Sequence, residues 1–372
     1  MPHTRLQDSK HGRVFATLLR EIENGRYKEG ERLPSEAKLV ERFGHSRITV
    51  GRALRDLQTA GKISRRAGAG SFVRSLHGAD RLSFGLLIPD LGETDIFEPI
   101  CRGMMESPLA RHHALVWGST SAHAGVADAG ARAWQLCQHY VERRVDGVFF
   151  APVERSPEPG DVNHQVVDAL GAAGIPVVLL DRTVTPYPDP GQHDLVGIDN
   201  RRAGYVITEH LLRRGVRRVI FVRQPNSAPT VDAREAGYRE AMFAWHAPVD
   251  QLEGARIEPG DDTQVERLLG ARRPEGIVCA NDRTAGRLMH TLRRLGVRVP
   301  DDVRLAGIDD IEFASLLPVP LTTLRQPTRA LGEVALSVML ERVARRDLPA
   351  RDMRLRCELV VRESCGSATA PG

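Results

Sequence analysis

The chain lacks any apolar run long enough to cross a membrane. Its longest apolar stretches, such as Pro176–Leu180 and Gly85–Pro89, have the length of strands, whereas a membrane-spanning helix needs roughly 18 apolar residues. The first 25 residues carry several basic side chains and lack the apolar core of a secretory signal. We therefore expect neither a membrane anchor nor export.

Cysteines are few, and their spacing does not pair them. The five stand far apart and form no C-x-x-C motif (Cys101, Cys137, Cys279, Cys357 and Cys365). An odd number at such spacing argues against a disulfide framework and against a structural zinc site. We expect a reduced, cytoplasmic protein.

Motifs that carry catalysis are also missing. There is no G-x-x-x-x-G-K-[ST] phosphate loop and no H-E-x-x-H zinc motif. Gly68-Ala-Gly70 lacks the third glycine of a dinucleotide fingerprint, and Gly118-Ser-Thr-Ser121 is not G-x-S-x-G. The adjacent His112 and His113 have no acidic partner at ligand spacing. We predict that the chain is not an enzyme and holds neither a cofactor nor a metal.

What the sequence does have is an uneven charge. Its 372 residues fit two or three domains. Residues 1–78 carry a net charge of +8, with 16 Lys and Arg against 8 Asp and Glu, whereas the remainder carries −4. All four lysines lie in this basic segment, the last of them at Lys62. The division predicts a nucleic-acid partner for the front of the chain only.

The basic segment predicts three helices followed by two short strands. Apolar residues at helical spacing indicate a first helix over 13–24, and Ser35 and Ser46 can cap a second and a third. Strands are expected around 63–65 and 71–74. Such a helix-turn-helix brings the first residues of its recognition helix to base edges and its helix N-termini to phosphates. The helix pattern alone also permits a plain three-helix bundle with a solvated basic face.

Three strings in this region are more specific than the pattern. Gly30-Glu-Arg-Leu-Pro-Ser-Glu36, Phe43-Gly-His-Ser-Arg-Ile-Thr-Val50 and Arg65-Arg-Ala-Gly-Ala-Gly-Ser-Phe-Val73 closely resemble the GntR-type winged helix-turn-helix of bacterial transcription regulators. The resemblance covers residues 13–74 and implies that the recognition helix contacts bases while the wing tip enters the minor groove. The DNA-binding set that we predict is Ser35, Glu36, Ser46, Arg47, Thr49, Arg52, Arg65, Arg66, Gly68 and Gly70.

Three positions depart from that family's pattern. Ala37 stands where a polar or basic residue is common, Gly51 replaces a usual Arg, and Ala67 replaces a usual Gln. Gly51 also destabilises its helix by roughly 1 kcal/mol relative to Ala. Fewer side chains remain to read bases, so the departures concern operator preference rather than DNA binding itself.

Beyond a polar linker at 75–81, apolar strand-like runs alternate with helix-length segments. The expected strands are Phe84–Ile88, Ala114–Gly118, Gly147–Ala151, Pro176–Leu180, Leu195–Ile198, Arg218–Val222, Gly276–Ala280 and Val303–Ile308. Continuous apolar runs bounded by Gly, Pro or Asp indicate parallel sheets covered on both faces. We expect two doubly wound lobes, whose ligands lie beyond the carboxyl ends of the strands.

Polar side chains directly follow several of these strands. They are Asp90, Glu154, Asp181, Arg182, Asn281, Asp282, Asp309 and Asp310. Carboxylates and amides bond vicinal hydroxyls in pairs, so a cleft that they line suits a polyhydroxylated ligand. An Asp after a strand can equally cap the next helix, and the pattern leaves both interpretations open.

Again the strings are more specific than the pattern. Val196-Gly-Ile-Asp-Asn200, Ala280-Asn-Asp282, Gly307-Ile-Asp-Asp310 and Leu321-Thr-Thr-Leu-Arg-Gln326 resemble the effector domain of LacI/GalR regulators, which is similar to periplasmic sugar-binding proteins. The resemblance runs from about 83 to 363 and implies two Rossmann-like lobes, with the chain crossing between them near 190, 325 and 348. The residues that it implies for the effector site are Arg234, Asn281 and Asp309, with Gln326 close to the hinge. In the less typical first lobe we expect Phe97 to stack on the ligand and Asp90 to line the site.

Together these features predict an effector-responsive transcriptional regulator of the arabinose-repressor-type subfamily. The expected fold is α/β, with a winged helix-turn-helix at 1–75, a linker at 76–82, a two-lobed periplasmic-binding-protein-like effector and dimerisation domain of doubly wound parallel sheets at 83–365, and a tail at 366–372. We expect a homodimeric repressor of double-stranded operator DNA, in which a sugar or sugar derivative closes the lobes and changes the spacing of the DNA heads. The alternative is a cytoplasmic carbohydrate-binding or carbohydrate-processing protein whose front module only mediates interactions.

Overall fold

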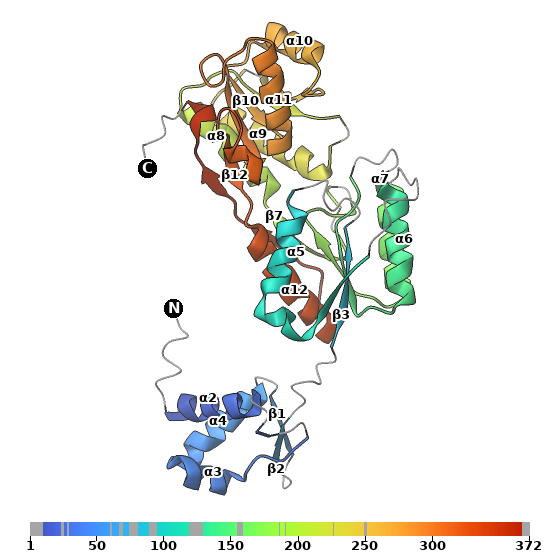
Figure 1. Cartoon of the computed structure of the whole chain (residues 1–372), viewed down its shortest axis with the longest axis vertical. Helices are drawn as coiled ribbons and strands as arrows, with labels where there is room; N and C mark the ends of the chain where they lie inside the picture. The colour runs from blue at the N-terminus through green and yellow to red at the C-terminus, as the bar shows by residue number, and fades with distance from the viewer. Residues whose placement is uncertain are drawn as a thin grey trace. The chain divides into compact units, whose positions relative to one another are not determined.

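The computed structural model divides the chain into two compact units, Met1–Leu82 and Ser83–Gly372 (Figure 1). The residues that it describes are 10–23, 26–27, 30–59, 62–66, 70–73, 81–88, 95–118, 129–154, 159–185, 187–189, 191–225, 227–248 and 251–366.

The N-terminal unit contains three helices and a two-stranded sheet. The helices are α2 (Lys10–Glu23), α3 (Glu36–Phe43) and α4 (Arg47–Thr59), and the antiparallel strands are β1 (Ile63–Arg66) and β2 (Gly70–Val73). The segment before α3 adds an extended edge to this sheet. There Leu33 N–H donates to Ser71 O, and Val73 N–H donates to Glu31 O, each at 2.9 Å. The backbone of β2 is therefore bonded on both sides.

The apolar stripes of the three helices meet in one core. Val14, Leu18 and Ile22 recur every fourth residue of α2 and are buried, as helical periodicity requires. They pack with Leu39 of α3 and with the buried stripe of α4, which includes Leu54. Burial of each aliphatic side chain stabilises the fold by roughly 1.5–3 kcal/mol. This core therefore fixes α4 against α2 and α3.

The C-terminal unit contains two six-stranded sheets, each covered by helices on both faces. The first sheet is wholly parallel, in the order β13 (Asp352–Leu355), β7 (Asp194–Ile198), β6 (Val177–Leu180), β5 (Gly147–Phe150), β3 (Ser83–Leu87) and β4 (Ala114–Trp117). Its helices are α5 (Phe97–Glu106), α6 (Ala129–Glu142), α7 (Pro159–Ala172) and α12 (Thr328–Ala344). The pair α5 and α12 lies on one side of this sheet and the pair α6 and α7 on the other (Figure 1).

The second sheet follows the same plan with one antiparallel edge. Its order is β14 (Glu358–Val360), β12 (Thr322–Arg325), β11 (Arg304–Asp309), β10 (Gly276–Cys279), β8 (Val219–Arg223) and β9 (Ala255–Arg256), and only β14 runs antiparallel. The helices packed with it are α8 (Asn200–Arg213), α9 (Pro229–Ala244), α10 (Asp262–Arg272) and α11 (Asp282–Arg294). Short 3-10 turns at Pro108–His112, Glu312–Ser315 and Glu363–Cys365 complete the unit. Two doubly wound lobes are therefore confirmed.

The chain crosses between the sheets at three places. It leaves the first sheet between β7 and α8, returns between β12 and α12, and leaves again between β13 and β14. The predicted crossing near 325 is confirmed, but those near 190 and 348 are wrong. The reason is that β7 still belongs to the first sheet, and β13 pairs in parallel with β7 before the chain crosses for the last time.

Glycines let one helix pair in each lobe approach backbone to backbone. A Cβ on Gly204 of α8 would lie 1.8 Å from the carbonyl oxygen of Arg234 in α9, and one on Gly332 of α12 would lie 2.1 Å from that of Ile100 in α5. Real Cβ atoms do not approach this closely, so each glycine is required by its neighbouring helix. The contact at Gly204 fixes the backbone that carries Arg234.

We predict that Gly204→Ala lowers the free energy of unfolding by about 1–3 kcal/mol, because overpacking forces α8 and α9 apart. Gly270 of α10 faces open space, so Gly270→Ala is the matched control and should be neutral or slightly stabilising. Urea denaturation of the two variants checks this. Equal midpoints would show that the helix contact is not tight.

Candidate functional sites

The exposed end of α4 is the candidate DNA-reading surface. Ser46 caps this helix: its Oγ accepts from Thr49 N–H at 3.3 Å and lies 2.9 Å from Thr49 Oγ1. Arg47 and Arg52 are exposed, whereas Thr49 is partly buried. The cap therefore orients the first turn of α4 and leaves its two arginines in solvent.

The start of α3 is tied to the wing. Ser35 caps α3 by accepting from Lys38 N–H at 3.4 Å, as the sequence predicted. Next to it, the Glu36 carboxylate accepts a hydrogen bond from the Arg65 guanidinium of β1. This ion pair links two of the predicted DNA-binding residues across 29 positions of sequence.

The wing is described in part. Gly70 begins β2 with a φ of 114°, a conformation that favours glycine. Arg66 pairs with Gly70 in the backbone register of β1 and β2. The predicted tip residue Gly68 lies outside the described residues.

One exposed residue of α4 escaped the sequence analysis. Ile48 is 81% exposed, although an isoleucine in a helix is usually buried. It lies off the buried stripe of Val50, Leu54 and Leu57, on the same face as Arg52. An apolar residue off the core stripe, directly beside Arg47, is the signal that could have revealed it.

In the second lobe, three of the predicted effector residues form one network. Arg234 is only 4% exposed and donates from Nε to Asn200 Oδ1 at 2.8 Å and from Nη1 to Ala280 O at 2.7 Å. Its Nη2 lies 3.5 Å from Asp309 Oδ1, which also accepts from Gln326 Nε2 at 2.7 Å. The predicted residues Arg234, Asp309 and Gln326 thus meet at the carboxyl edge of the sheet.

Asn281 lies beside this network and caps α11. Its Oδ1 accepts from Thr284 N–H at 2.8 Å, so one side of its amide serves the helix. The residue follows Ala280, whose carbonyl binds Arg234. The helix-capping interpretation therefore holds at this position, and a contact of Asn281 with an effector stays a prediction.

A buried carboxylate, that of Asp282, lies next to this network. Asp282 is fully buried and accepts from Thr323 Oγ1 at 2.6 Å and from Ile311 N–H at 3.2 Å. Burial raises the pKa of Asp282, and the neighbouring Asp309 carboxylate raises it further. A Cβ on Gly307 would lie 2.2 Å from Asp282 Oδ1, so glycine is needed there to leave room for this side chain.

Each lobe contains an aspartate with a positive backbone φ angle. Asp309 has a φ of 125° and Asp181 has a φ of 68°, and each stands at or directly after the carboxyl end of a strand. Non-glycine residues in such regions carry strain of about 1–3 kcal/mol, which typically clusters at binding sites.

The first lobe contributes a second cluster, around Arg182. This arginine is 5% exposed; its Nε bonds Asp181 Oδ2 and its Nη1 lies by Glu154 Oε2, both at 3.1 Å. Its guanidinium covers the ring of Phe97 at 5.6 Å. Phe97 is therefore buried beneath Arg182, and its stacking on a ligand stays a prediction. Asp90 lies outside the described residues.

An ion pair between Arg283 and Asp95 connects the two lobes. Arg283 Nη2 of α11 bonds both carboxylate oxygens of Asp95, which precedes α5, at 3.1 and 2.9 Å. Burial raises the pKa of Asp309, Asp181 and Asp95 of the first lobe raise it further, and Arg234 and Gln326 lower it. Carboxylates of the two lobes are thus close enough to repel one another.

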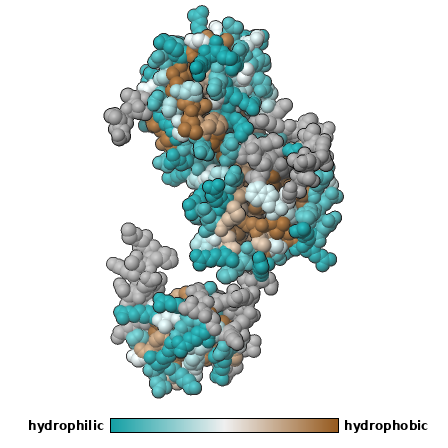
Figure 2. Space-filling model, viewed as in Figure 1, coloured by the Kyte–Doolittle hydropathy of each residue, from teal (hydrophilic) through white to brown (hydrophobic). Residues whose placement is uncertain are grey.

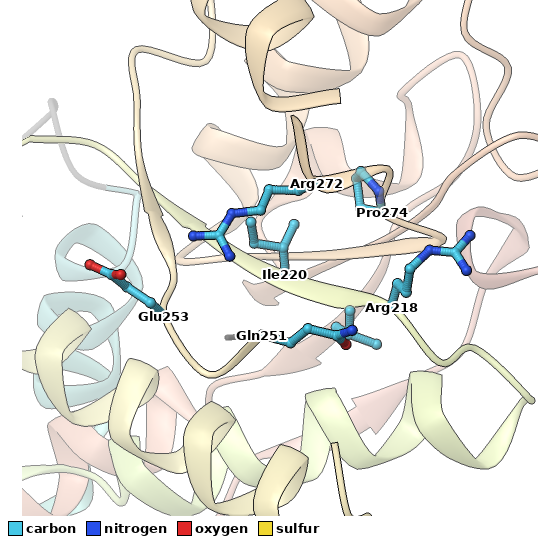
Figure 3. Close-up of a pocket in the computed structure, with 7 residues that line it drawn as sticks. Arg218, Ile220, Gln251, Glu253, Arg272 and Pro274 are labelled. Carbon is cyan, nitrogen blue, oxygen red and sulfur yellow. The ribbon is translucent and has the colours of Figure 1, made fainter. Parts of the chain in front are cut away.

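A recess at the amino end of β8, lined by Arg218, Ile220, Gln251, Glu253 and Arg272 among others (Figure 3), has space of about 20 Å³, the room of one water molecule. Among the described residues no group of three or more His, Cys, Asp or Glu is placed to hold a metal ion. No helix in the described ranges is long and apolar enough to cross a membrane.

Comparisons with known proteins agree with both units. Residues 10–73 match the gntR family of bacterial regulatory proteins, and residues 208–365 match the periplasmic binding protein-like domain. The arabinose metabolism transcriptional repressor of Geobacillus stearothermophilus is 27% identical over 368 residues, covering 95% of this chain and 97% of that one.

Solved structures show the same fold. A LacI family transcriptional regulator from Enterococcus faecium with bound ribose has a TM-score of 0.61 at 24% identity, over 76% of this chain and 98% of its own. The transcriptional regulator CelR in complex with cellobiose has a TM-score of 0.63 at 23% identity, over 96% of this chain and 99% of its own.

The chain is therefore a transcriptional regulator built from a winged helix-turn-helix and a two-lobed sensor. Its N-terminal unit matches the gntR family of bacterial regulatory proteins, and its C-terminal unit contains a periplasmic-binding-protein-like domain. These relatives are regulators rather than carbohydrate-processing enzymes, so the alternative weighed from the sequence is not supported.

We predict that Ser46→Ala destabilises the first turn of α4 by about 1 kcal/mol, because Thr49 N–H loses its acceptor. Amide hydrogen exchange over α4 in the full chain should then accelerate, while exchange over α2 stays unchanged. Ser46→Asp keeps an acceptor and is the control. Unaltered exchange in Ser46→Ala would contradict the cap.

Proposed function

We propose that the chain is a cytoplasmic repressor whose residues 1–75 bind operator DNA and whose residues 83–365 bind a sugar between two lobes. Residues 76–82 would link the two parts, and 366–372 would form a tail. The observation that carries the proposal is the meeting of Arg234, Asp309 and Gln326 at the carboxyl edge of the second sheet, with Asp181 acting on Asp309 from the first lobe. Three of the similar proteins reported above are named for, or bound to, arabinose, ribose or cellobiose, which supports a sugar.

The DNA-reading residues would lie on α4. Arg47 can bond the O6 and N7 atoms of a guanine in a bidentate manner, and the methyl group of Thr49 can meet a thymine. Arg52, Arg65 and the wing would contact phosphates, which set the register without reading sequence. The exposed Ile48 adds an apolar group that suits the 5-methyl of a thymine.

A homodimer would present two such heads to a palindromic operator. Large apolar side chains support an interface on the first lobe: Met105 is 55%, Leu109 is 46% and Trp117 is 50% exposed. Brown patches interrupt the largely hydrophilic surface in Figure 2. Large exposed apolar side chains can contribute to a protein contact where they gather on one surface.

Control would come from closure of the lobes about the three crossings. A sugar that bonds both lobes favours the closed form, and it shifts the equilibrium only by its difference in affinity for the two forms. In a dimer, closure changes the spacing of the two heads and therefore the fit to two half-sites.

Arg47→Ala should weaken binding to an operator selected from random DNA by at least about tenfold, because the bidentate contact to guanine is lost. Arg47→Lys keeps the charge but not the fork, so it should keep non-specific binding and lose sequence preference. Gel shifts of both variants check this. Unchanged operator affinity in Arg47→Ala would rule out the assigned helix face.

Replacing thymine by deoxyuridine, one position at a time, tests Ile48. At one position in each half-site the loss of the methyl group should weaken binding by the full chain about threefold or more. Ile48→Ala should be insensitive to the same replacement. Equal sensitivity of both proteins at every position would contradict the contact.

Asp309→Asn should leave operator affinity intact and abolish the response to sugars, because the replaced carboxylate can no longer accept hydroxyl donors on both oxygens. The exposed Asp347→Asn is the control. Gel shifts with L-arabinose, D-ribose and cellobiose provide the measurement. A normal response of Asp309→Asn to a sugar that acts on the unmodified chain would show that the site lies elsewhere.

A further inference from the structure

A buried oxygen in the first lobe has no hydrogen-bond partner. Asp181 is 8% exposed and directly follows β6; its Oδ2 accepts from Arg182 Nε at 3.1 Å. Its Oδ1 is buried without any donor among the residues that the structure describes. A carboxylate oxygen can only accept hydrogen bonds while it is ionised, and leaving a buried acceptor unpaired is unfavourable. This oxygen therefore needs a hydrogen-bond donor that does not belong to the described residues.

The described arginines of the proposed site are already engaged. Arg182 bonds Asp181 and lies against Glu154 and Phe97. The second lobe's Arg234 donates to Asn200 and Ala280 and faces Asp309.

The remaining cleft arginine is engaged in the same way. Arg283 of α11 is held by Asp95 across the lobes. Every one of these guanidinium groups therefore faces a carboxylate.

Among the described residues of the proposed site, acidic groups outnumber basic ones. Four carboxylates, from Asp95, Glu154, Asp181 and Asp309, stand against the three arginines. Those of Asp95 and Asp181 act on Asp309 from the opposite lobe. A ligand with hydroxyl or ammonium donors between the lobes would relieve this repulsion, whereas an anion would add to it.

We infer that the effector is an uncharged or cationic compound that donates hydrogen bonds to Asp181 and Asp309, and that phosphorylated or carboxylated sugars are rejected. The inference rests on the proposed function, because it specifies the ligand of the same cleft. An anion would have to draw Arg182 or Arg234 away from a largely buried carboxylate, which would leave that carboxylate unpaired. The third arginine, Arg283, is partly exposed together with its partner Asp95. The charge of the ligand is thereby coupled to closure: only a donor draws the carboxylates of the two lobes together.

The test starts from the full chain bound to its selected operator. Small molecules extracted from cells that carry the gene are separated on an anion exchanger, and each fraction is assayed for its effect on DNA binding. The unretained neutral and cationic fraction should alter the gel shift, and the retained fraction should not. Activity confined to the retained fraction would overturn the inference. If operator binding is normal and neither fraction acts, effector control itself fails, and the inference falls with the proposed function.

Matched probes then measure the discrimination directly. D-ribose is compared with ribose 5-phosphate, L-arabinose with L-arabinonate, and the compound purified from the active fraction with its phosphate. The neutral member of any pair that binds should bind at least about 100-fold more tightly than the anionic member, as expected for added like charge in a desolvated site. Tighter binding of the anion would overturn the inference.

Two variants test which carboxylates cause the preference for the neutral compound over its phosphate. Asp181→Asn should weaken the active neutral compound about tenfold or more and reduce the preference over its phosphate, with operator affinity unchanged. Glu154→Gln is less buried, removes one negative charge and should also reduce that preference, so the test survives poor folding of the first variant. Asp189→Asn, at an exposed position of the same lobe, is the control. An unchanged preference in both test variants would contradict the role of these carboxylates.

Discussion

The guanidinium of Arg234 joins three elements of the second lobe at the point where the chain arrives from the first. It donates to Asn200, the first residue of α8 after the crossing, and to the carbonyl of Ala280 at the end of β10, and it faces Asp309 at the end of β11. A planar guanidinium with five fixed donors suits such a junction better than a lysine. Its position depends in turn on Gly204, which lets α9 lie directly against α8. Crossing, helix packing and cleft are thus coupled through one side chain.

The cleft also depends on opposed charges. Asp309 is held at a positive φ between Arg234 and Gln326, while Asp181 and Asp95 act on it from the other lobe. Without a ligand, the site therefore combines backbone strain, an unpaired buried oxygen and repulsion between lobes. In the proposed function, a molecule that donates hydrogen bonds to both lobes would relieve the unpaired oxygen and the repulsion, and its binding energy would favour closure. The N-terminal unit has a core of its own, and the residues that we propose to read DNA lie on the exposed side of α4.

Much of this architecture is predictable from the sequence. All eight strands expected from apolar runs are present within a residue or so, because burial on both faces demands continuous apolar sequence. Four strands were missed because they lack that signal: β9 has two residues, β14 has three, β13 is exposed at most positions, and β12 begins with two threonines. The crossings near 190 and 348 were misplaced because the pairing of β13 with β7 leaves no mark in composition.

The sites were predictable to different degrees. Position after a strand was enough to select Asp181, Arg182 and Glu154, and the resemblance to known regulators was needed for Arg234 and Gln326. The pair of Asp95 and Arg283 joins residues 188 positions apart, and no local pattern indicates it. Ile48 escaped because an apolar residue in a helix is ordinarily assigned to a core.

The most direct test of the account is thermodynamic reciprocity between the two sites. The affinity of the full chain for its sugar is measured by calorimetry with and without saturating operator DNA, and operator affinity is measured with and without saturating sugar. If binding in the cleft controls the heads, the two ratios must be equal and different from one. A sugar affinity that is the same with and without operator would contradict the account.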